Sequence, residues 1–440
     1  MEHVEGIVNA RWVVPIEPSG TVLSDYSVVV NRGKIVAVLP RHEAAVKFHA
    51  GKQIHLPKHV LIPGLVNSHT HASMSLMRGL ADDLPLMSWL QDHIWPAERA
   101  FVSPEFVYDG TTLACAEMLR GGVTCFNEMY FFPEAAARAA INAGLRASIG
   151  LIAIDFPTQY ASDPDDYLSK GLSLRDQLRD EPKISFCMAP HAPYTVGDDT
   201  LSRIVTIAEE LDLPIHIHIH ETLHEIEQSM LRHKARPLER LRALGLLGPR
   251  LIAVHAVHLL PSEIDELARS GCSVAHCPSS NLKLASGFAP VATMLKEGMN
   301  VGLGTDGAAS NNRLDIFQEM RLAALLAKGA SGDASAMPAP AALHAATLGG
   351  AKALGLDESI GSLAPGKQAD LCAVLLEGPG LTPCYDVVSH LVYAAGRENV
   401  SHVWVAGELL LEEGCPTRAD AGDLDKLGLL WQNKLSETKA

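Results

Sequence analysis

The sequence lacks the features of a nucleic-acid binder, a membrane protein or a secreted protein. Lys and Arg number 36 against 51 Asp and Glu, which leaves a formal net charge of −15. A nucleic-acid binder needs a basic surface to displace counterions. No apolar run approaches the roughly eighteen residues of a membrane helix, and the start Met-Glu-His-Val-Glu has no basic segment followed by an apolar one. We therefore expect a cytoplasmic protein with neither nucleic acid nor membrane as partner.

Paired cysteines are also missing. The chain has eight cysteines, but none forms a Cys-x-x-Cys pair, which argues against a thiolate zinc site or a redox pair. Scattered cysteines with apolar neighbours are typical of reduced core residues. The hydrophobic content is 47%, which supports a large core and argues against disorder.

The middle of the chain alternates short apolar runs with segments of helical composition. Eight such runs are residues 60–66, 123–129, 145–154, 184–189, 214–219, 251–257, 272–277 and 300–304. A strand followed by a helix, eight times over about 250 residues, is the pattern of a (β/α)8 TIM barrel. A doubly wound sheet is the alternative, but no Gly-x-Gly-x-x-Gly turn follows an early strand.

The two ends of the chain have a different pattern from the middle. Residues 26–30 and 34–39 are β-rich and flank Asn31-Arg32-Gly33, a predicted hairpin turn. β-type runs return at 369–375 and 402–411. The fold class predicted is α/β, a TIM barrel with a smaller discontinuous β-sandwich built from both termini. The predicted bounds are 1–62 and 365–415 for the sandwich, 63–364 for the barrel and 416–440 for a C-terminal surface helix.

Histidines gather where the predicted strands end, and catalytic groups of barrels lie at the carboxyl ends of strands. The first run continues into His69-Thr-His71, and residues i and i+2 of a strand point the same way. Two imidazoles so placed can hold one metal ion, although His-x-His alone is weak evidence and a pair of surface histidines is the alternative.

The later strands add to this pattern. Run five carries His216, His218 and His220, and alternation places all three on one face. Run six ends near His255, run seven at His276 and run eight at Asp306. Buried histidines without a ligand would each need hydrogen-bond partners. The combination predicts a metal site.

The donor types indicate the metal. Several imidazoles, one carboxylate and no thiolate suit zinc first, with Fe2+, Mn2+ or Co2+ as alternatives. A two-metal hydrolase of this architecture would want a carboxylated lysine at the end of run four, but Lys183 is at its other end. One ion per subunit is therefore favoured. The His-x-Glu and Pro-Cys-x-x-Cys signature of cytidine-type deaminases is absent, which excludes that fold.

Longer motifs carry a resemblance to a known family. They are Pro63-Gly-Leu-Val-Asn-Ser-His-Thr-His71, Met77-Arg-Gly-Leu-Ala-Asp-Asp-Leu84, Ala189-Pro-His-Ala-Pro-Tyr194, Ser280-Asn-Leu-Lys-Leu284, Gly302-Leu-Gly-Thr-Asp-Gly-Ala-Ala-Ser-Asn311 and Gly361-Ser-Leu-Ala-Pro-Gly-Lys-Gln-Ala-Asp370. From about residue 5 to 415 the chain resembles the amidohydrolase superfamily. Within it, the chain is similar to the branch of 5′-methylthioadenosine/S-adenosylhomocysteine deaminases and triazine hydrolases.

This resemblance implies roles for particular residues. The zinc ligands it implies are His69, His71, His218 and Asp306. His218 is selected over His216 and His220 because the family places the catalytic glutamate three residues later, at Glu221. His216 and His220 are then expected to pack in the barrel or to support the ligands. His255 matches the histidine beside the metal-bound water, Glu98 a ribose-binding glutamate and His191 a further substrate contact. Without the resemblance, Glu98 reads as an exposed helix carboxylate.

The resulting hypothesis is hydrolytic deamination of the adenine ring of a 5′-modified adenosine. Zinc would lower the pKa of its bound water from 15.7 toward about 7. Asp306 would take the proton of that water, His255 would orient the hydroxide and Glu221 would protonate N1, so that Glu221 and Asp306 also contact substrate. The pKa of Glu221 should then be raised in the closed site.

The substrate expected first is 5′-methylthioadenosine, with S-adenosylhomocysteine or adenosine as secondary substrates. The reason is that residues 150–166 contain no Arg or Lys, where family members that take S-adenosylhomocysteine have arginines. The alternatives are a deaminase or dechlorinase of guanine, 8-oxoguanine or a triazine and, from another class, a catalytically silent scaffold. The resemblance also suggests a homodimer, and residues 76–95, rich in Met, Leu and Trp, are the candidate lid.

Overall fold

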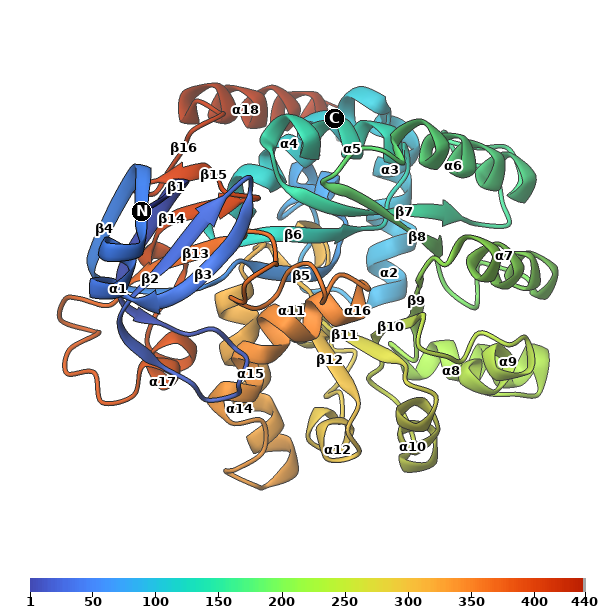
Figure 1. Ribbon diagram of the computed structural model, residues 1–440. Coiled ribbons are helices and arrows are strands. Elements are labelled where there is room, and N and C mark those ends of the chain that lie inside the picture. Colours follow the sequence, from blue (N-terminus) through green and yellow to red (C-terminus); the bar gives the residue numbers. More distant parts are fainter. Residues whose placement is uncertain (438–440) are drawn as a thin grey trace.

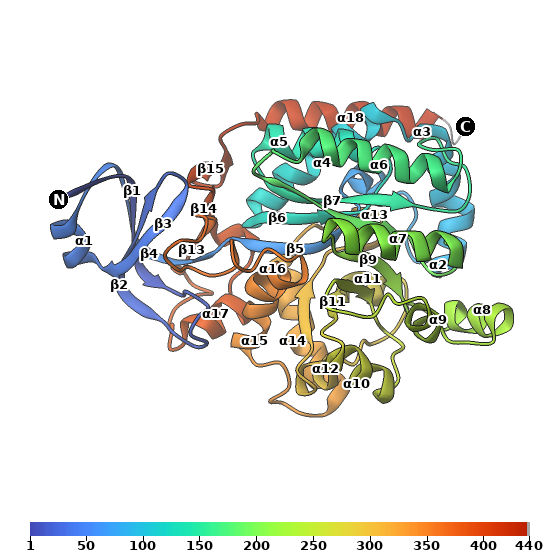
Figure 2. The same cartoon turned by 45° about the vertical axis from the view of Figure 1, so that its right-hand side comes forward.

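Two sheets of eight strands organise the chain, which is described over residues 1–437 by a computed structural model. The first sheet has the order β16-β15-β14-β13-β4-β1-β2-β3 and the second β12-β11-β10-β9-β8-β7-β6-β5. Figures 1 and 2 show the first sheet to one side of the second. The fold class predicted from the sequence, a TIM barrel with a smaller β unit from both termini, is confirmed.

The first sheet joins strands from the two ends of the chain. Its strands are β1 (Glu2–Val13), β2 (Leu23–Asn31), β3 (Lys34–Pro40), β4 (Phe48–Pro63), β13 (Leu371–Leu375), β14 (Val400–Val405), β15 (Glu408–Glu412) and β16 (Cys415–Pro416). The predicted hairpin joins β2 to β3, and both Arg32 and Gly33 have positive φ, as its two-residue turn requires. The run at 402–411 is two strands rather than one, because Ala406 and Gly407 form a second such turn.

The barrel strands are parallel and buried along almost their whole length. They are β5 (Leu65–Thr70), β6 (Val123–Glu128), β7 (Arg146–Ala153), β8 (Ile184–Pro190), β9 (Ile215–Ile219), β10 (Leu251–His255), β11 (Ser273–His276) and β12 (Asn300–Leu303). Apolar and β-branched residues fill these runs because both faces are covered. The barrel closes between β12 and β5, where the Ser68 hydroxyl donates to the Leu303 carbonyl at 2.7 Å and the Asp306 N–H to the His69 carbonyl at 3.0 Å.

The predicted bounds of the first barrel strand are wrong. Residues 60–63 belong to β4 in the terminal sheet, and the barrel begins at Leu65 after Gly64. A Cβ atom on Gly64 would lie 2.0 Å from the Thr124 hydroxyl oxygen, so glycine allows β5 to pass close to β6. The predicted domain bounds themselves stay a prediction.

A buried ion pair ties the terminal sheet to the barrel. Arg146 of β7 donates from Nε to Asp370 Oδ2 at 3.1 Å and from Nη2 to Asp370 Oδ1 at 3.3 Å. The two side chains are only 8% and 2% exposed. The Asp370 carbonyl also accepts the N–H of Gly64. The turn before β13 is therefore fixed to the point where the barrel starts.

Helices surround the barrel and connect its strands. Most begin at a proline, or at a Ser, Thr or Asp whose side chain accepts a backbone N–H, as Ser103, Asp163 and Thr222 do. The helices that cover the terminal sheet and the first barrel half are α1 (Arg41–Lys47), α2 (Leu86–Trp89), α3 (Trp95–Phe101), α4 (Pro104–Arg120), α5 (Pro133–Ala143), α6 (Pro164–Leu178) and α7 (Asp198–Leu211). A 3-10 turn over Ala72–Met77 precedes α2, and a π turn over Leu90–Ile94 links α2 to α3.

The second half of the chain continues the same pattern. Its helices are α8 (Leu223–His233), α9 (Pro237–Ala243), α10 (Pro261–Arg269), α11 (Pro278–Lys283), α12 (Val291–Lys296), α13 (Ala308–Asn311), α14 (Ile316–Ser331), α15 (Ala339–His344), α16 (Gly350–Ala353), α17 (Val387–Tyr393) and α18 (Ala421–Glu437). A π turn over Ala345–Gly349 and a 3-10 turn over Arg397–Asn399 complete the elements. No helix within residues 1–437 is both long and apolar enough to cross a membrane.

The last helix returns to the barrel. In Figures 1 and 2, α18 runs beside α4 and α5. Trp431 is buried there, with its indole N–H donating to Asp109 at 2.8 Å and its ring 5.2 Å from that of Phe106. The helix predicted near the C-terminus is thus present and anchored by one aromatic side chain, and residues 438–440 of that predicted segment lie outside the described residues.

Candidate active site and metal centre

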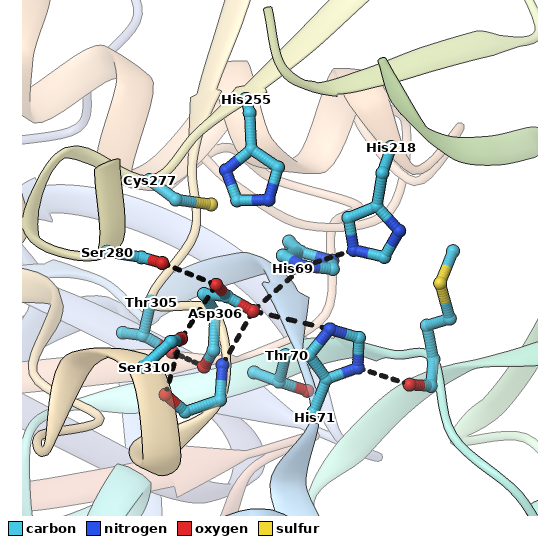
Figure 3. A network of polar contacts seen from close by, with 12 residues as sticks. His69, Thr70, His71, His218, His255, Cys277, Ser280, Thr305, Asp306 and Ser310 are labelled. Carbon is cyan, nitrogen blue, oxygen red and sulfur yellow. Dashed lines mark hydrogen bonds and ion pairs between the residues drawn. The ribbon is translucent and has the colours of Figure 1, made fainter. Parts of the chain in front are cut away.

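Four histidines and one aspartate converge at the carboxyl end of the barrel. His69 is the second-last residue of β5 and His71 follows this strand, His218 lies on β9, His255 ends β10 and Asp306 follows β12. Figure 3 shows their side chains pointing toward one another, with Asp306 beside His69 and His71. Strands far apart in sequence supply these groups because the carboxyl ends of parallel strands meet at one end of the barrel.

The distances among these groups fit a single metal ion. Asp306 Oδ1 lies 3.3 Å from Nε2 of His69 and 3.3 Å from Nε2 of His71. His218 Nε2 lies 3.3 Å from His69 Nε2. Donor atoms within 4.8 Å of one another form two sets that share His69, one with His71 and Asp306 and one with His218 and His255. Imidazole nitrogens and a carboxylate at such spacing suit a zinc-type ion.

The outer nitrogen of each ring is held by an acceptor. His71 Nδ1 faces the Met129 carbonyl at 2.5 Å, and His218 Nδ1 faces the His191 carbonyl at 2.6 Å. His255 Nδ1 lies 2.8 Å from the Asn281 side-chain oxygen. Because these oxygens only accept, each Nδ1 carries the hydrogen and each Nε2 keeps its lone pair for the centre of the cluster.

Burial keeps the imidazoles of His69, His71 and His218 uncharged, as metal ligands must be. It lowers the pKa of His69 to about 4, and it lowers the pKa of His71 and, by much more, that of His218. Burial would raise the pKa of Asp306, but the hydrogen bond from His69 and the nearby His71 hold that pKa well below its usual range. The site therefore offers neutral nitrogens around one anionic oxygen.

Asp306 is fixed from several sides. Its Oδ2 accepts hydrogen bonds from Ser280 at 2.6 Å and from Ser310 at 2.8 Å, and its Oδ1 accepts the Gly307 N–H at 2.8 Å. Its backbone has φ of 61°, and that of His255 has φ of 67°. Such left-handed conformations cost energy in residues with a side chain and gather at functional sites.

Glu221 lies beside this cluster, two residues after the end of β9. Its Oε2 is 3.9 Å from Nε2 of His255. The Glu225 carboxylate accepts the backbone N–H groups of His220 and Glu221 at 3.1 and 2.9 Å, so it holds the chain at Glu221 in place. Burial raises the pKa of Glu221 above its usual value, which favours the protonated acid.

The remaining histidines of this region differ in orientation. His216 Nε2 lies 3.1 Å from His69 Nδ1, which places it behind a ligand candidate as expected. The expectation that His220 shares the face of His218 is wrong, because φ at His220 is 54° and breaks the alternation. Its Nε2 accepts the Leu238 N–H at the start of α9 instead. His276 is buried and borders a separate small cavity.

A cavity of about 530 Å³ opens above the cluster. His71, His218, Glu221, His255 and Asp306 form its polar floor. The predicted lid segment contributes apolar walls, namely Leu86, Trp89, Leu90, Ile94 and Trp95. Movement of this segment as a lid stays a prediction.

The two substrate contacts implied by the resemblance also line this cavity. Glu98 of α3 is only partly exposed, and burial raises its pKa to about 7. His191 follows β8, and its Nδ1 lies 2.9 Å from the Thr195 hydroxyl. All eight predicted site residues thus lie at one end of the barrel, with His69 fully buried beneath the cavity floor. Their individual roles stay predictions.

Two cavity residues were missed by reasoning from the sequence. The Tyr130 hydroxyl donates to Glu98 Oε1 at 2.7 Å, and the rule that catalytic groups follow barrel strands would have found Tyr130, two residues after β6. Arg99 lines the cavity next to Glu98 and is exposed. The sequence does not place Arg99 next to residues 150–166, where a cation was expected, because α3 meets that segment only in the fold.

Comparisons with known proteins identify similar sequences over nearly the whole chain. Residues 60–410 match the model of the amidohydrolase family. A 5-methylthioadenosine/S-adenosylhomocysteine deaminase of Saccharophagus degradans is 48% identical over 434 residues, which cover 99% of this chain and 97% of the relative. A protein of the same name from Teredinibacter turnerae is 46% identical over 97% of each chain.

Solved structures show the same similarity. A crystal structure of an adenosine deaminase from Xanthomonas campestris with bound zinc has a TM-score of 0.98 and 50% identity, and the match covers 99% of both chains. Atrazine chlorohydrolase from Arthrobacter aurescens in complex with zinc has a TM-score of 0.89 at 24% identity, over 97% of this chain and 99% of that one. At that identity the second likeness concerns the fold alone.

Proposed function

The chain belongs to the amidohydrolase family, and on that premise we propose that it is a zinc-dependent deaminase of the adenine ring of 5′-modified adenosines. The substrate proposed first is 5′-methylthioadenosine, converted with water to 5′-methylthioinosine and ammonia. It is a hydrolase of C–N bonds other than peptide bonds, in cyclic amidines. The names of the relatives and the zinc in the adenosine deaminase structure support this proposal.

One observation carries the proposal more than any other. Asp306 and the imidazoles of His71, His218 and His255 line the same cavity as Glu98, His191 and Glu221. A purine nucleoside needs both ends of such a cavity, because its ring reacts at one end while its ribose hydroxyls require acceptors at the other. The Glu98 carboxylate supplies such an acceptor.

His69, His71, His218 and Asp306 are the proposed zinc ligands. When bound, the ion supplies Lewis acidity that makes water acidic enough to act as a nucleophile near neutral pH. The outer hydrogen bonds described above keep the lone pairs of His71 and His218 directed to the centre of the cluster. His216 Nε2 contacts Nδ1 of His69 from the side away from the cluster centre.

The other polar residues of the floor move protons. Asp306 accepts a proton from the attacking water, and His255, held by Asn281, orients that water toward C6 of the ring. Glu221 donates its proton to N1, so that negative charge does not build up on the ring. Asp306 then passes its proton to the departing amino group, and the proton of the new C6 hydroxyl returns to Glu221 as the carbonyl forms. At the end of the reaction Glu221 is protonated again and Asp306 is again a carboxylate.

The raised pKa of Glu221 supports its role as the acid. A carboxyl group that donates a proton near pH 7 must hold it at that pH, and burial of Glu221 favours the protonated form. Asp306, whose pKa is held low by the adjacent histidines, is available as the carboxylate. Glu221 is thus protonated because it is buried, whereas Asp306 is a carboxylate because histidines lie next to it.

A coupled ammonia assay on zinc-loaded protein tests the proposal. The panel is 5′-methylthioadenosine, adenosine, S-adenosylhomocysteine, guanine, 8-oxoguanine and a chlorotriazine. Fast release of ammonia from 5′-methylthioadenosine is the expected result. Turnover of a free base or of the triazine, with none of any adenosine, would refute the assignment of Glu98 as a ribose contact and with it the proposed substrate class.

We also propose a cytoplasmic homodimer. The resemblance to the family suggests the dimer. All eight cysteines, which lie within the described residues, are free thiols, and six of them are buried. Free cysteines of this kind are typical of proteins in a reducing compartment.

A further inference from the structure

The cavity above the metal centre has one strongly basic side chain. Among its lining residues, Arg99 is the only Lys or Arg. It directly follows Glu98 on α3 and is exposed at the rim, whereas the acidic groups Glu221 and Asp306 are buried at the floor. The charge of the cavity is therefore divided, with acids and imidazoles inside and a guanidinium at its entrance.

Arg99 lies where α3 contacts the segment that follows β7. Its backbone carbonyl accepts a hydrogen bond from Gln159 Nε2 at 3.2 Å, and Gln159 also lines the cavity. The segment that contains Gln159, residues 150–166, has no Arg or Lys of its own. The Arg99 side chain of α3 therefore supplies a positive charge next to residues 150–166, which have no Arg or Lys.

The guanidinium is also free to bind an anion. Within residues 1–437, no carboxylate lies within 4.0 Å of Arg99, whereas Arg236 and Arg240 near the adjoining cavity each hold an ion pair. A guanidinium presents its N–H groups in a planar fork that matches the two oxygens of a carboxylate. An unpaired Arg at a cavity rim is therefore suited to a carboxylate that enters with the substrate.

We propose that Arg99 determines specificity for adenosines whose 5′ thioether ends in an amino-acid carboxylate, as in S-adenosylhomocysteine. This inference rests on the proposed function. The adenine ring lies at the metal centre and the ribose hydroxyls bind Glu98, so the 5′ substituent is the part of the substrate left to extend toward the rim. The Arg99 guanidinium then donates hydrogen bonds to its carboxylate, and the cavity takes both the neutral and the charged substrate.

A second cationic group offers a competing position. An adjoining cavity of about 270 Å³ is lined by Arg232 and shares Phe156, Tyr194 and Thr195 with the first. Arg232 is separated from Glu98 by this shared wall, whereas Arg99 is the next residue in the chain. We therefore assign the carboxylate to Arg99, and Arg232 provides the matched control.

The experiment compares kcat/KM for two substrates in four proteins. These are the zinc-loaded wild type, Arg99→Met, Arg99→Lys and Arg232→Met, each assayed with 5′-methylthioadenosine and S-adenosylhomocysteine. Methionine keeps the apolar stem and removes the charge. We expect Arg99→Met to lower kcat/KM for S-adenosylhomocysteine by about tenfold or more, as for loss of one charge-assisted hydrogen bond. The kcat/KM for 5′-methylthioadenosine should stay within about twofold of the wild-type kcat/KM.

The other variants and a salt series complete the test. Arg99→Lys should recover part of the loss and Arg232→Met should show none. In the wild type, raising NaCl from about 0.05 to about 0.5 M should lower the value for S-adenosylhomocysteine only, because the guanidinium is exposed and screened. An equal loss for both substrates would mean a structural role for Arg99, and a selective loss in Arg232→Met would assign the carboxylate to the adjoining cavity; either overturns the inference.

Failure of this inference differs from failure of the proposed function. If the wild type deaminates neither adenosine, the proposed function is wrong and the inference falls with it. If the wild type deaminates 5′-methylthioadenosine and the ratio of the two kcat/KM values does not change in Arg99→Met, only the inference is wrong.

Discussion

Replacing Tyr130 by Phe tests how the cavity recognises ribose. The Tyr130 hydroxyl donates to one oxygen of Glu98 at 2.7 Å and leaves the other oxygen free for a substrate hydroxyl. Tyr130 is 5% exposed, so the ring of Phe fits the same space. The variant removes one hydrogen bond to an ionisable group and little else, and Tyr130 acts as a positioning residue for Glu98.

The expected size and pH dependence follow from the pKa of Glu98. A hydrogen bond to a charged group contributes about 1.5–3 kcal/mol, which corresponds to a loss of tenfold or more in kcat/KM. Burial raises the pKa of Glu98 to about 7, and the Tyr130 hydrogen bond lowers it. Removing that bond raises this pKa further, so less carboxylate is present at pH 7. The loss should therefore be largest at pH 6–7 and should shrink toward pH 9, where Glu98 is ionised in both proteins.

The assay follows ammonia release from adenosine and from 2′,3′-dideoxyadenosine between pH 6 and 9. Tyr130→Phe should lower kcat/KM for adenosine and leave that for the dideoxy compound nearly unchanged. Tyr108→Phe is the matched control, because its hydroxyl accepts a hydrogen bond from Asn142 outside the cavity. An equal loss for both substrates, or a loss that does not depend on pH, would refute this reasoning.

Three further predictions concern the acid, the metal and the junction of the two sheets. Glu221→Gln should lower turnover at least a hundredfold and keep stoichiometric zinc in metal analysis; near-native turnover would remove Glu221 from the mechanism. Chelation with dipicolinate should lower the Tm, and added zinc should restore it, because the ligand set exists only in the folded chain; an unchanged Tm would argue against a metal at His69 and Asp306. Arg146→Met should cost about 3–5 kcal/mol in urea unfolding, since it leaves the Asp370 carboxylate buried and unpaired; a cost below about 1 kcal/mol would contradict that role.

The sequence alone determined those features that depend on near neighbours in the chain. Alternation of apolar runs with helical segments indicated the eight barrel strands, because each element must bury one face or stripe whatever surrounds it. The turn at Arg32-Gly33 was likewise recognisable, since it depends on the backbone freedom of those two residues. The histidines near the ends of several predicted strands, together with Asp306, were sufficient to predict a metal site, although His69 and His71 alone were weak evidence.

Only the tertiary structure decided which distant residues meet. The hydroxyl of Tyr130 reaches Glu98 across 32 residues of chain, and Asn67 closes the barrel against Thr305 across 238. Arg99 is a candidate for binding the 5′ substituent because the fold brings α3 beside Gln159. Local sequence patterns do not predict such contacts, because these contacts arise from the packing of whole strands and helices around a common core. The ligand candidates followed from motifs that resemble the family, whereas their hydrogen-bond partners and the shape of the cavity depend on the fold.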